Sequence, residues 1–359
     1  MYRAGIIGAG GVAGMGIFGT DPTADIGTTA VDRSHAGGYR AAEGVELVAI
    51  ADVDEGALNQ FGEAWDIPDT HRYASHSAML AQADLDLVSV CTPSLYHREH
   101  VIDAARTDGV RAIWCEKPLA CSVGAAEGAS EVCAEEGVDL VVNHSQRFLR
   151  QSQTVRDAIA DGVIGDVQTV TAASSMELFR VGTHTVDLVT FLLDSRAKTV
   201  GGYITGENES AEHLGDGVDL DDAGGGGFVV FEDDVVATYE GSAPRDTADG
   251  FIRISGTDGR LTRDERGWTR WTGGSRSGEP LEQLAGPTGG YEDDHRQSFE
   301  NAAGHLVDLA DGNAVNLSSG RDACRTVEIL IGFFLGHETG STVSMPIDGP
   351  LKRVEITSW

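Results

Sequence analysis

Lysine is almost absent from this chain, whereas acidic residues are abundant. Among the 359 residues 26 are basic, and only those at positions 117, 198 and 352 are lysines; 57 are aspartate or glutamate, and the net charge is −31. A nucleic-acid-binding surface needs a basic face for the phosphates, so this balance argues against a direct DNA or RNA partner. Mimicry of a nucleic acid by the acidic residues is an alternative interpretation of the same charge.

The acidic residues are spread along the chain, and runs such as FEDDVV and DGVDLDD adjoin apolar or glycine-rich segments. A disordered acidic protein would lack such segments. At molar salt the Debye length shrinks to about 3 Å, so repulsion between surface carboxylates is largely screened. Carboxylates also hold water and cations, whereas a lysine stem adds apolar surface. We therefore interpret the acidity as an adaptation to a halophilic cytoplasm.

Long hydrophobic runs and paired-cysteine motifs are absent as well. The longest apolar stretch, VEILIGFFLG, is shorter than the roughly 20 residues that span a bilayer, so we expect no membrane partner. A strand-like run, AGIIGAG, already begins at residue 4, which predicts that no signal peptide precedes the fold. The cysteines are odd in number and lack C-x-x-C spacing, so we expect buried thiols in a reducing compartment at Cys91, Cys115, Cys121, Cys133 and Cys324.

The first 145 residues alternate short apolar runs with segments of helical spacing. The apolar runs are YRAGIIGAG, VELVAIADVD, LDLVSVCTP, RAIWCEKP and VDLVVNHS. Consecutive apolar residues indicate strands that are buried on both faces, and segments such as SLYHREHVIDAARTDG end at glycine, as helices do. The alternation predicts an α/β domain over residues 1–145 with a doubly wound parallel sheet, the Rossmann arrangement.

A glycine pattern follows the first strand directly. In IIGAGGVAG, Gly8, Gly10 and Ala13 form G-x-G-x-x-A around Val12. Glycines at these positions let the backbone approach a pyrophosphate, and a helix N-terminus behind them attracts its charge. A plain tight turn would have the same pattern. The dinucleotide interpretation gains weight from the strand before the glycines and from Asp52 at the end of the second strand.

Asp52 favours NAD over NADP as the cofactor. A carboxylate at this position accepts hydrogen bonds from the adenosine ribose hydroxyls and repels a 2′-phosphate, and Asp54 adds to that repulsion. Asp52 lies 39 residues after Ala13, whereas about 20 is usual. The intervening sequence must therefore hold an insertion near the cofactor, either a surface loop or a lid.

From about residue 146 the composition changes to strand-like runs that are separated by turns. DVQTVTAAS, KTVGGYIT, GFVVFEDD, VVATYEGSA and FIRISGT, with the turns EDD and GTDGR, indicate an antiparallel sheet with one solvated face. RQSFENAAGHLVDLADG and CRTVEILIGFFLGHE are predicted as closing helices, and DDAGGGG and TGENESAEHLGDG as solvated connections. We expect residues 146–359 to form an α+β domain.

Several motifs together resemble the oxidoreductase family named after glucose–fructose oxidoreductase, inositol dehydrogenase and the rhizopine-catabolism protein (Gfo/Idh/MocA). They are the glycine loop, CTPSLYH, CEKPLA, VNHSQRF, IADGVIGDVQTV, GTHTVDLVTFLL and GSTVSMPI, and they cover almost the whole chain. The resemblance implies a Rossmann domain followed by an open, mostly antiparallel sheet with helices on one side. It also implies a homodimer or homotetramer, because the exposed face of that sheet commonly serves oligomer contacts in the family.

The E-K-P motif in CEKPLA gives Lys117 the leading catalytic role. The resemblance implies that this lysine sits beside the nicotinamide and the substrate hydroxyl, and that the peptide bond before Pro118 is constrained and often cis. Arginine cannot be deprotonated in a protein, whereas lysine can shuttle a proton if burial and a cationic nicotinamide lower its pKa from about 10.4. A chain that replaces its other lysines would therefore keep this one. The alternative is a lysine retained by chance on a solvated loop.

The resemblance also gives cofactor-side roles to Thr92, Pro93, His97, Glu116 and Arg147. Glu116 would hold the cofactor or orient Lys117. Thr92, Pro93 and His97 resemble the loop along which the dinucleotide runs, and Arg147 belongs to the VNHSQRF segment. His97 fits equally well as a helix-start residue that has no ligand contact.

In the second domain, His184 matches the family's active-site histidine, which hydrogen-bonds the substrate hydroxyl. A core histidine is the alternative. Many polyol dehydrogenases of the family have an aspartate four residues earlier, where this chain has Arg180. That arginine would bind a carboxylate or phosphate of the substrate, as in a sugar acid, or point to a surface acid. Asp187 is expected to be a structural partner on the same helix face as His184.

The implied function is an NAD-dependent dehydrogenase that oxidises a secondary hydroxyl of a sugar, polyol or sugar-acid-like small molecule, with Lys117 as proton acceptor. An NAD-retaining glycoside hydrolase is the alternative, and a non-catalytic NAD-sensing module is a third class. No metal is expected. His213, Asp216 and Asp219 carry ligand-type side chains, but a polar loop explains them better.

Overall fold

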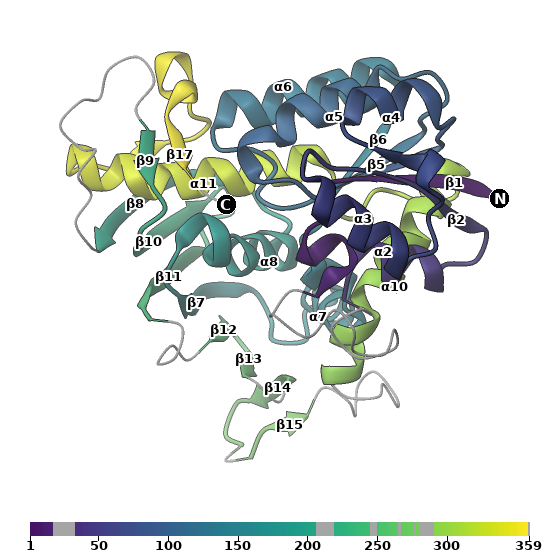
Figure 1. Cartoon of the computed structure of the whole chain (residues 1–359). Coiled ribbons are helices and arrows are strands. Elements are labelled where there is room, and N and C mark those ends of the chain that lie inside the picture. The colour runs from purple at the N-terminus through teal and green to yellow at the C-terminus, as the bar shows by residue number, and fades with distance from the viewer. Residues whose placement is uncertain are drawn as a thin grey trace. The chain divides into compact units, whose positions relative to one another are not determined.

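The computed structural model of the chain describes residues 1–16, 33–205, 219–244, 250–264, 267–275, 277–280 and 291–357. The chain forms two compact units (Figure 1). Unit 1 comprises Met1–Ala120, Ala126–Phe148 and Arg296–Arg321, and unit 2 comprises Cys121–Ala125, Leu149–His295 and Asp322–Trp359. Most of the predicted insertion between Ala13 and Asp52 falls outside the described residues, and so do His213 and Asp216.

Unit 1 is built on six parallel strands in the order β3-β2-β1-β4-β5-β6. The prediction of a doubly wound parallel sheet is therefore confirmed. The strand order reverses between β1 and β4, and open α/β sheets bind their ligands at such a point, beyond the carboxyl ends of the strands. The strands are β1 (Tyr2–Ile7), β2 (Val45–Ala51), β3 (Arg72–Tyr73), β4 (Leu87–Val90), β5 (Ala112–Cys115) and β6 (Asp139–Val142).

The helices between these strands begin at caps that the sequence supplies. Ser34, Asp54 and Ser75 each accept a hydrogen bond from the backbone N–H three residues later, at the start of α2, α3 and α4. β4 and β5 are buried at every residue, which is why they read as continuous apolar runs. The helices are α2 (His35–Ala41), α3 (Glu55–Ala64), α4 (His76–Gln82), α5 (His97–Ala105) and α6 (Val123–Glu136).

A helix from late in the chain completes the core of unit 1. The sequence predicts it as a closing helix of the second domain; it forms α10 (Tyr291–Ala310), but its residues from Arg296 onward belong to unit 1. The ring centroids of Phe299 and Trp114 lie 5.7 Å apart, and Ala302 and Leu306 join the same buried cluster. The periodicity of the segment predicts a helix, but it does not reveal which core the apolar face enters.

Unit 2 is built on a nine-stranded sheet in the order β15-β14-β13-β12-β7-β11-β10-β8-β16. β7 and β11 run parallel, and every other described pairing in this sheet is antiparallel, which confirms the mostly antiparallel sheet. A separate parallel pair joins β9 to β17. The strands are β7 (Val167–Ser175), β8 (Ala197–Thr205), β9 (Asp219–Asp221), β10 (Gly224–Phe231), β11 (Val236–Ala243), β12 (Phe251–Gly256), β13 (Gly259–Asp264), β14 (Gly267–Thr272), β15 (Glu279–Pro280), β16 (Val343–Ser344) and β17 (Glu355–Thr357).

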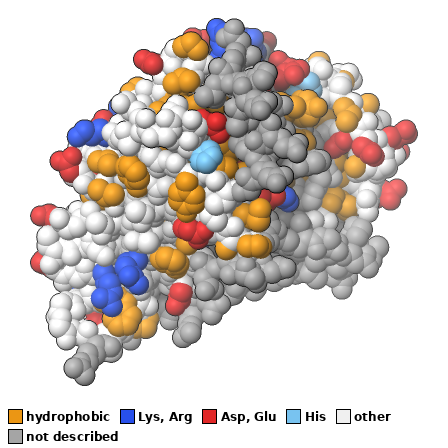
Figure 2. Space-filling model, turned by 90° about the vertical axis from the view of Figure 1, so that its left-hand side faces the viewer, with side chains coloured by type: hydrophobic (Ala, Val, Ile, Leu, Met, Phe, Trp, Pro, Cys, Tyr) orange, Lys and Arg blue, Asp and Glu red, His pale blue; other side chains and the backbone are white. Residues whose placement is uncertain are grey.

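The two faces of the unit 2 sheet differ. On one face, the Phe333 ring of α11 (Gly320–Thr339) stacks on Tyr239 with centroids 6.0 Å apart. On the other face, Tyr203, Phe228 and Phe251 each keep 37–41% of their surface exposed, and the strand registers place all three on that face. Two further helices of the unit are α7 (Arg150–Ala160) and α8 (Thr183–Leu193). Figure 2 shows carboxylates spread among apolar and uncharged side chains on one side of the molecule.

The prediction of a solvated connection at DDAGGGG is wrong for its glycines. Gly224–Gly227 form the first half of β10, between β8 and β11. A Cβ on Gly226 would lie 2.2 Å from the Tyr239 carbonyl oxygen, and one on Gly227 would lie 2.0 Å from that of Gly201. The run is therefore glycine because neighbouring backbone approaches closely. A loop and a crowded strand share this composition, so the sequence did not separate them.

Gly227→Ala is expected to lower the free energy of unfolding by more than about 2 kcal/mol, because the new methyl group would overlap backbone that cannot move away. Gly304→Ala in α10 is the matched control, since a Cβ there meets nothing within 4 Å, and it should stabilise the protein by roughly 0.5–1 kcal/mol. Urea unfolding of both variants in the same salt buffer is the measurement. Equal effects of the two substitutions would contradict the role assigned to Gly227.

Candidate active site

The glycine loop lies at the carboxyl end of β1, where the strand order reverses. Gly8 has a φ of 97°, and a Cβ there would lie 2.8 Å from the Cys91 carbonyl oxygen, so the fold itself requires this glycine. Gly10 differs, because a Cβ there would meet nothing within 4 Å. Packing within the described chain does not explain Gly10, whereas the close approach of a ligand would. Ala13 is fully buried, and Val12 packs against the core of unit 1.

The helix expected behind the glycines is present only as a short π-helical turn, η1 (Gly11–Met15), before the described chain stops at residue 16. Gly14 in this turn packs against α3, because a Cβ there would lie 2.5 Å from Trp65 Nε1. Trp65 Nε1 also donates to the Gly14 carbonyl oxygen at 3.2 Å. The glycine loop is therefore held by packing from α3 as well as by β1.

Asp52 braces the glycine loop from the end of β2. Its Oδ2 accepts from the Ala9 backbone N–H at 2.6 Å, and its Oδ1 accepts from the Asp54 N–H at 2.8 Å. Each carboxylate oxygen has more than one acceptor site, so Asp52 retains capacity to bind ribose hydroxyls. Asp54 has a role that the sequence analysis missed, because its side chain caps α3 by accepting from Ala57 N–H at 2.8 Å.

The loop after β4 is tied to the E-K-P loop by His97. His97 is the first residue of α5 and is 1% exposed; its Nε2 lies 2.7 Å from the Thr92 carbonyl oxygen, and its Nδ1 lies 2.8 Å from that of Pro118. Both ring nitrogens thus face the backbone, which favours the helix-start interpretation over a cofactor contact. Burial lowers the pKa of His97, although the two carbonyl groups oppose this effect. Pro93 stays exposed at the start of the next turn.

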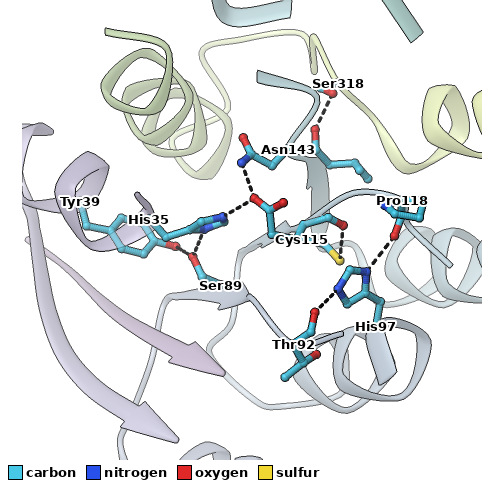
Figure 3. A network of polar contacts seen from close by, with 11 residues as sticks. His35, Tyr39, Ser89, Thr92, His97, Cys115, Pro118, Asn143 and Ser318 are labelled. Atoms are coloured by element: carbon cyan, nitrogen blue, oxygen red, sulfur yellow. Dashed lines mark hydrogen bonds and ion pairs between the residues drawn. The ribbon is translucent and has the colours of Figure 1, made fainter. Parts of the chain in front are cut away.

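A buried polar network at the end of β5 contains His35, Ser89 and Asn143 (Figure 3), and its centre is Glu116. Its Oε1 accepts a hydrogen bond from Asn143 Nδ2 and lies 3.1 Å from His35 Nε2. His35 Nδ1 in turn lies 2.8 Å from Ser89 Oγ, which bonds to Tyr39 OH at 2.7 Å. The network therefore joins α2, β4, β5 and the residue that follows β6.

The network keeps Glu116 charged in a buried place. Burial alone would raise the pKa of Glu116, but the hydrogen bond and charge of His35, the charge of Lys117 and the hydrogen bond from Asn143 together hold it below its ordinary value. Burial lowers the pKa of His35 even though Glu116 opposes this. At neutral pH the site therefore holds a carboxylate that is stabilised by a neutral imidazole and an amide.

The roles of His35, Tyr39, Ser89 and Asn143 were not predicted from the sequence. Asn143 belongs to the VNHSQRF motif, but that motif gave it no role. His35, Tyr39 and Ser89 belong to no recognisable motif, and the partners of all four residues lie far away along the chain. The one local signal is Ser34, the helix cap that places His35 at the start of α2.

Lys117 follows Glu116 directly and is half-buried. The peptide bond between Lys117 and Pro118 is cis, as the resemblance implies. Lys117 is close enough to Glu116 for its positive charge to lower the pKa of that carboxyl group. The structure therefore brings together the predicted residues Lys117, Glu116, Thr92 and His97 on adjacent loops of one sheet edge.

Arg147, which was predicted as a cofactor-side residue, contacts the backbone of unit 1. Its side chain is 4% exposed, and its Nη1 donates to the Leu317 carbonyl oxygen at 2.9 Å. This bond links the turn η4 (Ser145–Phe148) to the segment between α10 and α11. This contact is structural, and the cofactor-side role of Arg147 stays a prediction.

In unit 2, His184 lies in the first turn of α8 and is half-buried. Asp187 is fully buried, and its Oδ1 accepts from Thr326 Oγ1 on α11 at 3.0 Å, so its role is structural. Arg180 Nη1 lies 3.4 Å from Glu177 Oε1, and its backbone N–H donates to Asp222. Of the two interpretations of Arg180, this geometry supports the contact with an acidic side chain.

The described residues contain one group of side chains that could hold a metal ion. His76, Glu99 and Asp103 have ligand atoms within 4.8 Å of one another, but His76 Nε2 already bonds to Asp103 at 2.9 Å. Four of the five cysteines are buried and Cys324 is half-buried. No helix in the described part of the chain is long and apolar enough to cross a membrane.

Two family models match the chain in succession. Residues 2–144 match the model described as "Oxidoreductase family, NAD-binding Rossmann fold" (Gfo/Idh/MocA), and residues 172–345 match "Oxidoreductase family, C-terminal alpha/beta domain". Together the matches cover the glycine loop, the E-K-P motif and the helix with His184.

Relatives with assigned activities are similar to the chain over most or about half of its length. A D-apiose dehydrogenase from Paraburkholderia graminis is 27% identical over 349 residues, which covers 89% of this chain and 88% of the relative. An inositol 2-dehydrogenase from Rhizobium meliloti is 29% identical over 49% of this chain and 56% of the relative. A crystal structure of an inositol dehydrogenase homologue with NAD+ from Azotobacter vinelandii is 17% identical, covers 96% of this chain and 97% of its own, and has a TM-score of 0.73.

Proposed function

Because this chain belongs to the Gfo/Idh/MocA oxidoreductase family, we propose that it is an NAD-dependent dehydrogenase that oxidises a secondary hydroxyl group of a sugar, polyol or sugar acid. The observation that carries the proposal is the position of Lys117, the only lysine in the sequence of unit 1, directly after the charged and buried Glu116. A lysine that can lose its proton, next to a fixed carboxylate, is suited to accept a proton from an alcohol.

The residues of unit 1 fit a nicotinamide dinucleotide. Gly10 leaves room for a phosphate at the loop after β1, and Asp52 offers carboxylate oxygens at the end of β2. NAD, when bound, supplies the acceptor for the hydride. The chain's own residues supply the proton chemistry: Lys117 takes the hydroxyl proton, and Glu116 stabilises the resulting ammonium group. His184 keeps its predicted role, which is to orient the hydroxyl group.

NAD is expected to be preferred over NADP by at least about tenfold in kcat/KM, because Asp52 repels a 2′-phosphate. Asp52→Ser should reduce that ratio by about tenfold, since it removes the charge. Asp54→Asn is the comparison, because asparagine also caps a helix; it removes only the additional repulsion expected from Asp54, so the ratio should fall much less than in Asp52→Ser. Steady-state kinetics with both cofactors are the measurement, and a tenfold preference of the unaltered protein for NADP would overturn the assignment.

A panel of sugars, polyols and sugar acids, assayed for NADH absorbance in concentrated KCl, tests the proposed reaction and identifies its substrate. NADH formation with at least one member is the expected result. Release of an aglycone from glycosides without net NADH would favour the NAD-retaining glycoside hydrolase instead.

A homodimer or homotetramer also belongs to the proposal. Its support is the outer face of the unit 2 sheet, on which Tyr203, Phe228 and Phe251 are all exposed although each is large and apolar. Light scattering in molar KCl measures the mass of the particle. The mass of a single chain would contradict this part of the proposal.

A further inference from the structure

Both hydrogen-bond donors that reach Glu116 meet the same oxygen. Asn143 Nδ2 and His35 Nε2 converge on Oε1, and the described residues place no hydrogen bond on Oε2. The His35 side chain is completely buried, whereas that of Glu116 keeps 11% of its surface exposed. The carboxylate is therefore anchored by one buried oxygen, and its other oxygen remains available at the edge of the sheet that carries Lys117.

We propose that His35 is a positioning residue for Lys117: it keeps Glu116 ionised and turned so that its charge stabilises the ammonium form of the lysine. The inference rests on the proposed function, in which Lys117 gains a proton from the substrate hydroxyl. A buried carboxylate without donors takes up a proton, because burial penalises its charge. His35 and Asn143 provide the donors that prevent this.

The orientation of His35 is fixed from three sides. Its Nδ1 lies 2.8 Å from Ser89 Oγ, and its ring lies 3.8 Å from that of Trp114, centroid to centroid. Phe299 packs on it edge-on, with the ring centroids 5.8 Å apart. The imidazole therefore cannot turn its Nε2 away from Glu116 without breaking the packing of α2 and α10. A side chain that served only to fill the core would not need this polar alignment.

Glu116 supplies a negative charge close to Lys117 over the neutral pH range. Among the described residues, the titratable groups other than Lys117 that interact with Glu116 are His35, His97, Cys91 and Cys115. Burial lowers the pKa of both histidines and raises the pKa of both thiols, so all four are neutral there. Loss of the Glu116 charge should consequently not be compensated by these four groups.

The scarcity of lysine makes the test direct. Amine labelling followed by mass spectrometry reports the titration of Lys117 and Lys198 in one sample, because the chain has only three lysines. Lys198 is the internal reference, since its side chain is 59% exposed and pairs with Asp234. The pH at which labelling is half-maximal is measured on the full chain in molar KCl, without substrate or cofactor. This midpoint does not depend on how easily the reagent reaches the amine.

Glu116→Gln should lower the midpoint of Lys117 by about one pH unit, because a nearby opposite charge favours the ammonium form by about that much. His35→Leu should move it in the same direction, and His35→Gln, whose amide can still donate to Oε1, should leave it near that of the unaltered protein. Lys198 should not move in any variant. Thermal melting confirms that each variant is folded.

An unchanged midpoint in His35→Leu, beside a lowered one in Glu116→Gln, would overturn the role of His35. Equal shifts in His35→Leu and His35→Gln would show that packing rather than the donated hydrogen bond matters. If His35→Leu does not fold, His35→Asn replaces it, because its shorter amide does not reach Oε1 and should give the same lowered midpoint. Since labelling requires no turnover, failure of the dehydrogenase assay and failure of this inference are distinguishable.

Discussion

Replacing Lys117 by arginine is expected to reduce kcat at least about one hundredfold while NAD binding stays within about threefold. The positive charge and much of the reach of the side chain survive the change. The ability to lose a proton does not, because an arginine side chain stays protonated in proteins. The substitution would therefore remove the group that accepts the substrate proton, but it would keep a positive charge next to Glu116.

The measurement combines kcat, taken with the best substrate of the panel, with NAD titration by tryptophan fluorescence. Lys198→Arg is the matched control, since the Lys198 side chain is 59% exposed and pairs with Asp234 at 3.5 Å. It should behave like the unaltered protein. Near-normal turnover of Lys117→Arg would show that Lys117 provides only charge or structure.

The second large effect is expected from salt. With a net charge of −31, carboxylates across the surface repel one another in dilute buffer, where the Debye length is about 30 Å at 0.01 M. A fold has only about 5–15 kcal/mol of stability to set against this repulsion. Molar KCl screens the repulsion and strengthens apolar burial. We therefore propose a halophilic protein whose melting temperature rises by about 10 °C or more through the molar range.

The structure explains why the screening of favourable ion pairs by salt should cost little stability. The described ion pairs include Arg180–Glu177 and Lys198–Asp234, whose side chains are 33–84% exposed, and such pairs contribute only about 0–1 kcal/mol each. Thermal melts in a KCl series measure the effect, and a sucrose series separates charge screening from general solvent exclusion. A flat profile from dilute buffer to molar KCl would defeat the halophile interpretation and leave the scarcity of lysine unexplained.

The features that could be predicted from the sequence are those set by residues that are close together along the chain. The apolar runs LVSV and AIWC predict strands that are buried on both faces. The structure confirms this, because every residue of β4 and β5 is buried. The glycine loop and the E-K-P motif are contiguous, so their positions at strand ends could be anticipated. By contrast, His35 reaches Glu116 across 81 positions of the chain, and no motif joins them.

Two further differences have the same physical origin. The glycine run in DDAGGGG resembles a turn. These positions must be glycine, however, because the backbones of β8 and β11 lie too close for a Cβ atom. The apolar face of α10 could have entered either core, and Phe299 places it beside Trp114. Periodicity reveals that a face is apolar, whereas the surface that covers it depends on the assembled fold.

The central claim, net oxidation by NAD with Lys117 as the proton acceptor, is tested most directly by stoichiometry. With the best substrate of the panel in molar KCl, NADH formed and substrate consumed are measured together, for the unaltered protein and for Lys117→Arg. The account predicts one NADH for each molecule of substrate consumed, and loss of both signals in the variant. Substrate consumption without net NADH, or an unaltered rate in the variant, would contradict it.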